Sequence, residues 1–169
     1  MSKSLNKLLS QLVELHPKYI DLSLKRILNL LEKLGNPHLN IPPVIHIAGT
    51  NGKGSTLSFI YHILKNNGFN THVYISPHLK LFNERIILSN KIIKTEKLIE
   101  TLKHLKKINK DNPITFFEII TAAAFLLFSL EKADFLILET GLGGRLDATN
   151  VIKSSLIDII TPIGIDHQE

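Results

Sequence analysis

The chain of 169 residues contains no cysteine. Disulfide bonds, thiolate catalysis and cysteine-based zinc sites are therefore excluded, and the composition fits a reducing compartment. Long apolar runs are also missing. The longest one, Ile119 to Leu130, is interrupted by Thr121 and Ser129, and it is too short for a membrane span, which needs about 20 apolar residues. The amino terminus has no clean apolar core followed by a small-residue cleavage site, so no signal peptide is indicated. We expect a cytoplasmic protein with no membrane partner.

Aromatic residues are absent from the most basic segment of the chain. Twenty basic and fifteen acidic side chains give a net charge of +5. Much of the basic charge lies at Lys91, Lys94, Lys97, Lys103, Lys106, Lys107 and Lys110. Because no aromatic side chains alternate with these lysines, no stacking platform for nucleic-acid bases is indicated. The segment is predicted to be the solvated face of a helix, and the positive charge favours small anionic ligands such as nucleotides.

A glycine-rich segment is the most informative feature that is present. It consists of Gly49, Thr50, Asn51, Gly52, Lys53, Gly54, Ser55 and Thr56. An extended β-branched run at 43–48 precedes it and a helical pattern follows it. A strand, a glycine turn and a helix amino terminus gather backbone N–H groups around one point, which favours binding of a polyphosphate. Lys53 would reach the outer phosphates, and the Ser55 hydroxyl would ligate Mg²⁺.

This segment departs from the commonest phosphate-loop pattern. Gly54 stands between Lys53 and the first hydroxyl residue, Ser55, whereas the common pattern places the hydroxyl directly after the lysine. The alternative interpretation is a glycine-rich turn with a solvated lysine. The strand, loop and helix context favours the phosphate site.

The order of elements predicts an α/β fold with a mostly parallel sheet and helices on both faces. Helices are expected at about 5–13, 24–34, 53–66, 95–109 and 116–130. Strands are expected at about 43–48, 71–75, 135–138 and 156–160, with a small hairpin from 84–88 to 92–93 around Ser89-Asn90. The last two strands are mainly apolar, 135–138 throughout and 156–160 apart from Asp158, which predicts central strands covered on both faces.

Ligands of such sheets bind at the carboxyl ends of the strands. The residues that follow the predicted strands are polar or glycine-rich. They are the glycine-rich segment itself, Ser76-Pro77-His78, Glu139 with Gly141, Gly143 and Gly144, and Asp166-His167. Glu139 would supply a hard oxygen ligand for Mg²⁺ beside the Ser55 hydroxyl. The alternative for Glu139 is a surface ion pair with Arg145.

Other candidates have plain structural alternatives. His167 is either a metal ligand or a structural histidine, and Ser76 is either a ligand or the start of a turn. Phe116 and Phe117 are most simply core residues of a buried helix. Glu118 beside them needs a partner or a ligand, because a carboxylate on an apolar helix is unfavourable alone.

Several motifs occur together in one order along the chain. They are Leu15-His16-Pro17, Ile20-Asp21-Leu22, the glycine-rich segment, Ser76-Pro77-His78-Leu79, Phe82-Asn83-Glu84-Arg85-Ile86, Thr115-Phe116-Phe117-Glu118, the run from Glu139 to Asn150, and Asp166-His167. This set resembles the N-terminal part of folylpolyglutamate synthase/dihydrofolate synthase, the folate branch of the Mur ligase family. The glycine-rich segment alone is shared with peptidoglycan Mur ligases, so another Mur-type ligase is one alternative. A non-catalytic nucleotide- or pterin-binding remnant is another.

The resemblance implies an ATP-dependent amide ligase of folate metabolism. The terminal phosphate of ATP would pass to a substrate carboxylate, and the amino group of L-glutamate would then attack the acyl phosphate. The acceptor would be dihydropteroate or a folate that already carries glutamate. ATP and Mg²⁺ are the implied cofactors.

The resemblance also implies roles for individual residues. Lys53, Glu139 and His167 would be catalytic, and Ser76, Glu139 and His167 would be the Mg²⁺ positions. ATP would bind at Gly49–Thr56. The pterin substrate would bind at Tyr19, Ile20, Asp21, Leu22, Thr115, Phe116, Phe117, Glu118, Leu146, Asp147 and Ala148, with a flat face from Phe117 and a hydrogen-bond acceptor from Asp147.

The chain differs from the family in small substitutions and in length. Ser23 stands where the family usually has glycine, and Thr140 stands where valine is common. Family members run more than twice as long and add a catalytic lysine and a C-terminal domain. We therefore expect residues 1–169 to be the N-terminal part of a Mur ligase-type ATP-binding domain, with 1–40 as a helical lead-in and 41–169 as an incomplete α/β core. Alone it would be inactive or incomplete, with an unpaired sheet edge prone to aggregation, unless a separately encoded C-terminal half completes it.

Overall fold

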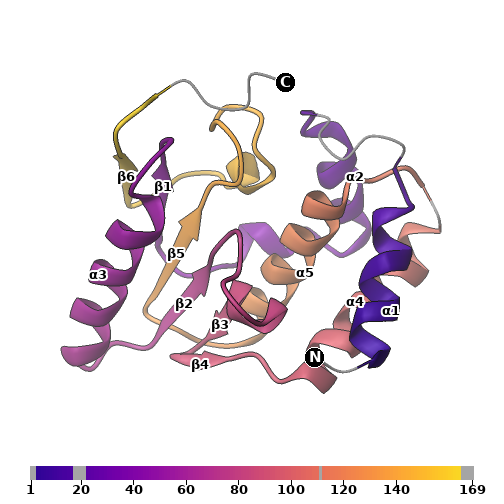
Figure 1. Ribbon diagram of the computed structural model, residues 1–169, viewed down its shortest axis with the longest axis horizontal. Coiled ribbons are helices and arrows are strands. Elements are labelled where there is room, and N and C mark those ends of the chain that lie inside the picture. Colours follow the sequence, from indigo (N-terminus) through magenta and orange to yellow (C-terminus); the bar gives the residue numbers. More distant parts are fainter. Residues whose placement is uncertain (1–2, 17–21, 111, 165–169) are drawn as a thin grey trace.

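A six-stranded sheet forms the centre of the molecule. The structure is a computed structural model that describes residues 3–16, 22–110 and 112–164. The strands lie in the order β4-β3-β2-β5-β1-β6 (Figure 1). Their bounds are β1 Val44–Ala48, β2 Thr71–Tyr74, β3 Ile86–Leu88, β4 Lys91–Ile92, β5 Phe135–Glu139 and β6 Ile157–Ile160. The strands β2, β5, β1 and β6 run parallel, whereas β3 and β4 form an antiparallel hairpin on β2.

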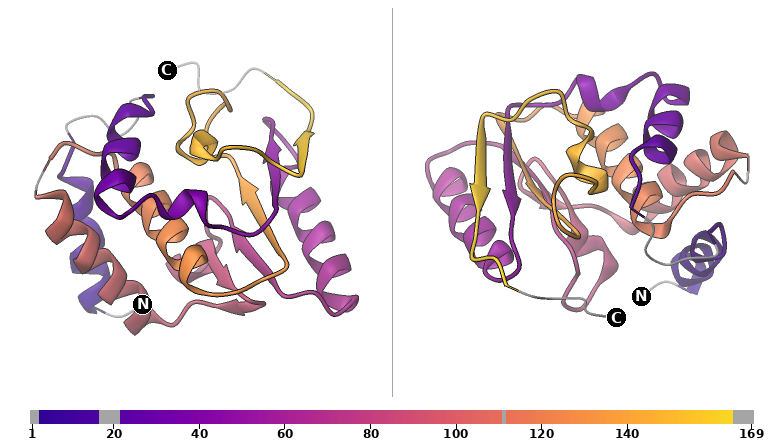
Figure 2. Two further views of the ribbon diagram at one scale, coloured as in Figure 1. Left: turned by 180° about the vertical axis from the view of Figure 1, so that it is seen from behind. Right: turned by 90° about the horizontal axis from the view of Figure 1, so that it is seen from above.

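Helices cover both faces of this sheet. The α-helices are α1 Lys3–Val13, α2 Lys25–Lys33, α3 Lys53–Asn66, α4 Thr95–Asn109 and α5 Phe116–Leu130. Short 3₁₀ helices are η1 Pro37–Leu39, η2 Phe82–Arg85 and η3 Ala148–Val151. Figures 1 and 2 show α3 on one face, with α5, α4, α1 and α2 on the other. The predicted fold class, a mostly parallel α/β sheet between helices, is confirmed.

The central position of β5 in the sheet explains why its first four residues, 135–138, are all apolar. The strand pairs with β1 on one side and β2 on the other. Successive side chains of a strand point to opposite faces. Accordingly, Ile137 joins the core beneath α3, whereas Leu136 and Leu138 join the larger core beneath α5. The same alternation places Glu139 on the α3 face, which bears on the site below.

The helix α5 begins with a capping box at Thr115 and Glu118. The Glu118 backbone N–H donates to Thr115 Oγ1 at 3.3 Å, and the Thr115 N–H donates to Glu118 Oε2 at 2.7 Å. These bonds satisfy backbone donors that a helix amino terminus otherwise leaves unpaired. They also fix both side chains at the start of the helix.

The prediction that 156–160 is a central strand covered on both faces is wrong. Within the described residues β6 pairs with β1 alone and forms one edge of the sheet. Ile157 and Ile160 are 48% and 72% exposed. A mainly apolar segment indicates a tendency to be buried, but it does not indicate whether a neighbouring strand is present on each side.

The predicted hairpin exists, but its first strand is shorter than expected. Glu84 and Arg85 belong to η2, and pairing begins at Ile86. The predicted ranges for α4 and α5 match the structure. None of the helices in the described ranges is long and apolar enough to cross a membrane.

Candidate functional site: a phosphate loop beside an apolar pocket

The glycine-rich segment forms the tight connection between β1 and α3. Gly49 and Gly52 have φ angles of 136° and 84°, in the region that favours glycine. A Cβ at Gly49 would lie 2.1 Å from Thr161 Oγ1, so any side chain there would collide with the segment after β6. The N–H groups of Thr50 and Asn51 donate to the Pro162 carbonyl at 3.1 and 3.3 Å. The loop is therefore held in place by the segment that follows β6, the strand at one edge of the sheet.

The Lys53 side chain lies folded over this loop. Its Nζ donates to the carbonyl oxygens of Gly49 at 2.8 Å and Thr50 at 3.4 Å. Gly52 is the N-cap of α3, and Gly54 and Ser55 are exposed at the start of the helix. A positive helix terminus, a lysine and an exposed hydroxyl thus share one surface, an arrangement suited to phosphate groups.

Glu139 lies next to this loop, at the carboxyl end of β5. Its side chain is 6% exposed, and its Oε2 accepts the Ser76 backbone N–H at 3.1 Å. Its Oε1 lies 3.9 Å from where a Cβ on Gly54 would be. Burial raises the pKa of the Glu139 carboxyl, while the Ser76 hydrogen bond and the Lys53 charge act in the opposite direction. The structure thus brings together residues from the ends of three neighbouring strands.

The alternative of a surface ion pair between Glu139 and Arg145 is not seen. None of the ion pairs between described residues joins them, and Arg145 is exposed while Glu139 is buried. A buried carboxylate with a raised pKa favours a nearby cation, because a cation stabilises the ionised form.

The donor set around Glu139 fits Mg²⁺ rather than a softer metal. Within the described ranges, no three His, Cys, Asp or Glu side chains gather into a metal-binding group. The Glu139 carboxylate is next to the backbone of Ser76, and the hydroxyls of Ser76 and of Ser55 in the neighbouring loop would add only hard oxygen atoms. Mg²⁺ usually takes few protein ligands beside phosphates and water. The predicted third ligand, His167, lies outside the described residues.

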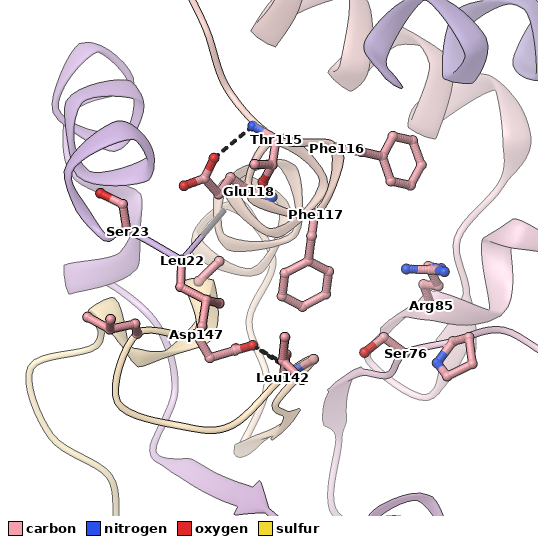
Figure 3. A pocket seen from close by; sticks show the side chains of 14 residues that line it. Leu22, Ser23, Ser76, Arg85, Thr115, Phe116, Phe117, Glu118, Leu142 and Asp147 are labelled. Atoms are coloured by element: carbon pink, nitrogen blue, oxygen red, sulfur yellow. Dashed lines mark hydrogen bonds between the residues drawn. The ribbon is translucent and has the colours of Figure 1, made fainter. Parts of the chain in front are cut away.

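An apolar pocket of about 300 Å³ opens beside Ser76 (Figure 3). It is lined by Leu22, Ser23, Ser76, Pro77, Arg85, Thr115, Phe116, Phe117, Glu118, Gly141, Leu142, Leu146, Asp147 and Ala148. All the predicted substrate residues that the structure describes are in this set. The remaining three, Tyr19, Ile20 and Asp21, lie outside the described residues. Phe116 and Phe117 are partly buried and line the pocket as well as packing against the core.

The orientation of Phe117 is fixed by Gly141. A Cβ at Gly141 would lie 2.5 Å from Phe117 Cζ and 2.8 Å from Cε1. The ring edge therefore packs directly on the glycine backbone, and Figure 3 shows the ring in the middle of the pocket. A glycine at 141 is needed for this close approach.

Glu118 has an ion-pair partner, as expected for a carboxylate on an apolar helix. Its Oε2 accepts a hydrogen bond from Arg26 Nε at 3.0 Å, in an ion pair that connects α5 to α2. Its Oε1 is buried and has no hydrogen-bond partner. Buried polar atoms are usually paired, so this oxygen is an exception inside the wall of the pocket and is not exposed to it.

The Asp147 carboxylate is fully used by the protein. Its Oδ2 accepts the N–H groups of Gly141 and Leu142 at 2.9 and 2.8 Å. Its Oδ1 accepts the Thr149 N–H at 2.9 Å and the Thr149 hydroxyl at 2.6 Å. The side chain is only 2% exposed. In this structure Asp147 shapes the glycine-rich 141–144 loop, whereas the family resemblance implied a hydrogen-bond acceptor for the substrate.

A buried histidine supports Asp147 from β1. His46 Nε2 lies 2.8 Å from Thr149 Oγ1. Since Thr149 donates its only hydroxyl proton to Asp147, His46 Nε2 carries the proton in this contact. Burial lowers the pKa of His46, which favours the neutral ring. Sequence reasoning missed this network; a histidine inside an otherwise apolar strand was the available signal.

Comparisons with known proteins agree with this geometry. No protein-family model matches the chain. A curated dihydrofolate synthase/folylpolyglutamate synthase of Haemophilus influenzae is 45% identical over 161 residues, which are 95% of this chain and 36% of that protein. The solved structure of Escherichia coli FolC with DHPP and ADP matches with a TM-score of 0.90 and 36% identity, over 99% of this chain and 41% of that one.

A further solved structure is a bifunctional folylpolyglutamate synthase/dihydrofolate synthase with Mn, AMPPNP and L-glutamate bound. It matches with a TM-score of 0.87 and 36% identity, over 98% of this chain and 39% of that one. The chain thus spans between about a third and two fifths of the length of these relatives. Over that length it belongs to the dihydrofolate synthase/folylpolyglutamate synthase family.

Proposed function

We propose that this chain carries the ATP site and the acceptor pocket of a ligase that adds L-glutamate to dihydropteroate or folylpolyglutamate through an acyl phosphate. One observation carries the proposal: the phosphate loop and the apolar pocket meet at Ser76. This residue lines the pocket, and its N–H binds Glu139 beside the loop. A reaction between a carboxylate and the terminal phosphate of ATP needs two adjoining sites of this kind, because it depends on positioning.

On the nucleotide side, the segment Gly49–Thr56 would bind the phosphates. The backbone N–H groups at the start of α3 would face them, and Lys53 would exchange its present carbonyl partners for phosphate oxygens. That exchange is favourable because a hydrogen bond between two charged groups is stronger than one to a neutral carbonyl. Lys53 and the helix terminus would then stabilise the charge that develops during transfer.

Glu139 and Ser76 would hold Mg²⁺ together with the Ser55 hydroxyl, and His167 would complete the set. When bound, the ion would neutralise part of the charge on the phosphates. The position of Glu139 is set by the Ser76 N–H and by the α3 face of β5. Lys53, Glu139 and His167 are the residues to which we assign catalytic roles.

On the acceptor side, the pocket would bind the pterin ring. Phe117 would stack against its face, and Glu118 would form part of the wall from the first turn of α5. Leu146 and Leu22 would close the apolar wall. Asp147 would act through the loop that it holds, and the lead-in segment 19–21 would complete the site.

The helical lead-in and the α/β core would have different roles in the ligase. Residues 1–40 would supply one wall of the acceptor pocket, and residues 41–169 would supply the incomplete nucleotide-binding core. The glutamate site would lie on a further domain, either on the same polypeptide or on a separately encoded C-terminal half. The activity proposed here is that of the completed ligase.

Equilibrium binding to the purified chain tests the two sites separately. We expect Mg-AMPPNP and dihydropteroate each to bind. Lys53→Ala should weaken nucleotide binding by about 10- to 100-fold, because it removes a charged hydrogen bond, and should leave dihydropteroate unaffected. Phe117→Ala should weaken dihydropteroate binding by about 5- to 150-fold, because stacking on an aromatic ring is typically worth about 1–3 kcal/mol. It should leave nucleotide binding unaffected.

Two further measurements decide between the alternatives. Binding of a UDP-linked muramyl precursor in place of dihydropteroate would instead indicate a peptidoglycan ligase. Incorporation of labelled glutamate should require the further domain on which we place the glutamate site. If the chain bound both ligands but never turned over, even with that domain supplied, it would be a non-catalytic binding module.

A further inference from the structure

Among the described residues that line the acceptor pocket, Arg85 is the one cation. It stands at the junction of η2 and β3, and its carbonyl accepts the Ile75 N–H at 3.1 Å. Because β3 runs antiparallel to β2, Arg85 at the start of β3 lies beside the carboxyl end of β2, close to Ser76. Figure 3 shows Arg85 and Ser76 on the same side of the pocket, across from Asp147 and Glu118.

The guanidinium of Arg85 is held in one orientation. Its Nε donates to His78 Nδ1 at 3.1 Å, and its central carbon lies 5.2 Å from the Phe82 ring centroid. Both contacts come from residues near it in the chain, and both leave the terminal Nη groups unused. In the described part of the chain, Arg85 forms no ion pair with any carboxylate.

The two acidic residues of the pocket do not neutralise Arg85. Glu118 is paired with Arg26, on the opposite wall. Both oxygens of Asp147 accept hydrogen bonds from Gly141, Leu142 and Thr149. The pocket therefore presents one oriented positive charge at the end nearest to Ser76 and the phosphate loop.

An oriented guanidinium with free Nη groups is suited to a carboxylate. Arginine binds carboxylates through two parallel hydrogen bonds, and an apolar surround strengthens charged hydrogen bonds relative to water. The opposite end of the pocket offers the face of the Phe117 ring. A ligand with an aromatic heterocycle at one end and a carboxylate at the other would match both ends.

We propose that Arg85 binds the carboxylate of the acceptor and orients it toward the terminal phosphate of ATP. This inference rests on the proposed function and adds a positioning residue to it. In the step that Arg85 would assist, a carboxylate oxygen forms a bond to the terminal phosphorus while the bond to the ADP oxygen breaks. ADP leaves with that electron pair, and Arg85 neither gains nor loses a proton.

The test compares two ligands that differ only at the carboxylate. Dihydropteroic acid and its methyl ester are titrated into the purified chain without nucleotide. The wild-type chain should bind the acid about 10- to 100-fold more tightly, the usual range for hydrogen bonds to a charged group. Arg85→Gln should bind both ligands with the affinity of the wild-type chain for the ester. Arg85→Lys should keep part of the preference.

A matched control removes a charge from the same segment. Lys80 is exposed and does not line the pocket, so Lys80→Gln should keep the full preference for the acid. Unchanged ester binding in Arg85→Gln shows that the pocket is intact, which a purely structural role of Arg85 would not produce.

Three outcomes would overturn the inference. Equal binding of acid and ester by the wild-type chain would remove the role of Arg85 while leaving the pterin pocket in place. An unchanged preference in Arg85→Gln, together with weaker Mg-AMPPNP binding, would assign Arg85 to the nucleotide. Failure of both acid and ester to bind would refute the proposed acceptor pocket itself.

Discussion

Replacing Gly141 with alanine should damage the acceptor pocket without touching the phosphate loop. The new Cβ would lie 2.5 Å from Phe117 Cζ and 2.8 Å from Cε1, whereas carbon atoms pack best at about 3.5–4.0 Å. The ring must therefore retreat by about 1 Å. Overpacking of this kind typically costs about 1–3 kcal/mol, and Tm should fall by roughly 2–12 °C for a domain of this size.

The same displacement should weaken binding of dihydropteroate. Phe117 lies in the middle of the pocket, so a shifted ring occupies space that the ligand needs. If the whole strain of about 1–3 kcal/mol opposes ligand binding, the affinity for dihydropteroate falls roughly 5- to 150-fold. Mg-AMPPNP affinity should stay within about twofold, because surface and distant changes are usually worth less than 0.5 kcal/mol.

Gly144 provides the matched control. The nearest atom to a Cβ there is Ala48 Cβ at 4.0 Å, which is ordinary contact. Gly144→Ala should therefore leave Tm and both affinities nearly unchanged. Phe117→Leu should relieve part of the clash, so the double variant with Gly141→Ala should be more stable than the sum of the two single changes predicts. Equal Tm and equal dihydropteroate affinity for Gly141→Ala and Gly144→Ala would refute this reasoning.

Two further predictions concern buried polar groups. Burial raises the pKa of Glu139, so its contribution to stability is largest below the ordinary carboxyl pKa and is lost as pH rises through the raised value. Glu139→Gln should therefore raise Tm by a few degrees at neutral pH in chelator, while Mg-AMPPNP should stabilise it less than the wild-type chain; a lower Tm for the variant would contradict this. Thr149→Val should leave Asp147 and His46 without their shared partner, at a cost of about 2–4 kcal/mol in urea unfolding. Thr149→Ser keeps the hydroxyl and should lose much less, and equal losses for both variants would show that the network contributes little.

Elements with a strong local pattern could be predicted from the sequence. The ranges of α4 and α5 match because apolar spacing and capping are local properties of the chain. The gathering of Lys53, Ser76 and Glu139 follows from one rule about the carboxyl ends of parallel strands. These residues lie far apart in sequence, but the topology leaves few other places for them.

Properties that depend on distant partners could not be predicted. The edge position of β6 depends on whether another strand is present, which an apolar run does not report. The need of Glu118 for a partner was visible, but the choice of Arg26, 92 residues away, was not. Arg85 was visible only as part of a motif. Its place on the pocket wall depends on the antiparallel pairing of β3 with β2. The periodicity of the sequence alone does not predict the direction of that strand.

The two halves of the candidate site are built from different chemical groups, and this affects how each half tolerates substitution during evolution. The phosphate loop consists largely of backbone groups, fixed by Gly49 and Gly52. The acceptor pocket consists of side chains, several of them on exposed positions such as Leu22 and Leu146. Under the proposed function, most substitutions at the loop glycines would abolish nucleotide binding, whereas substitutions at the pocket rim would change which acceptor is bound. Under that proposal, single replacements could change the acceptor during evolution while the activation step is kept.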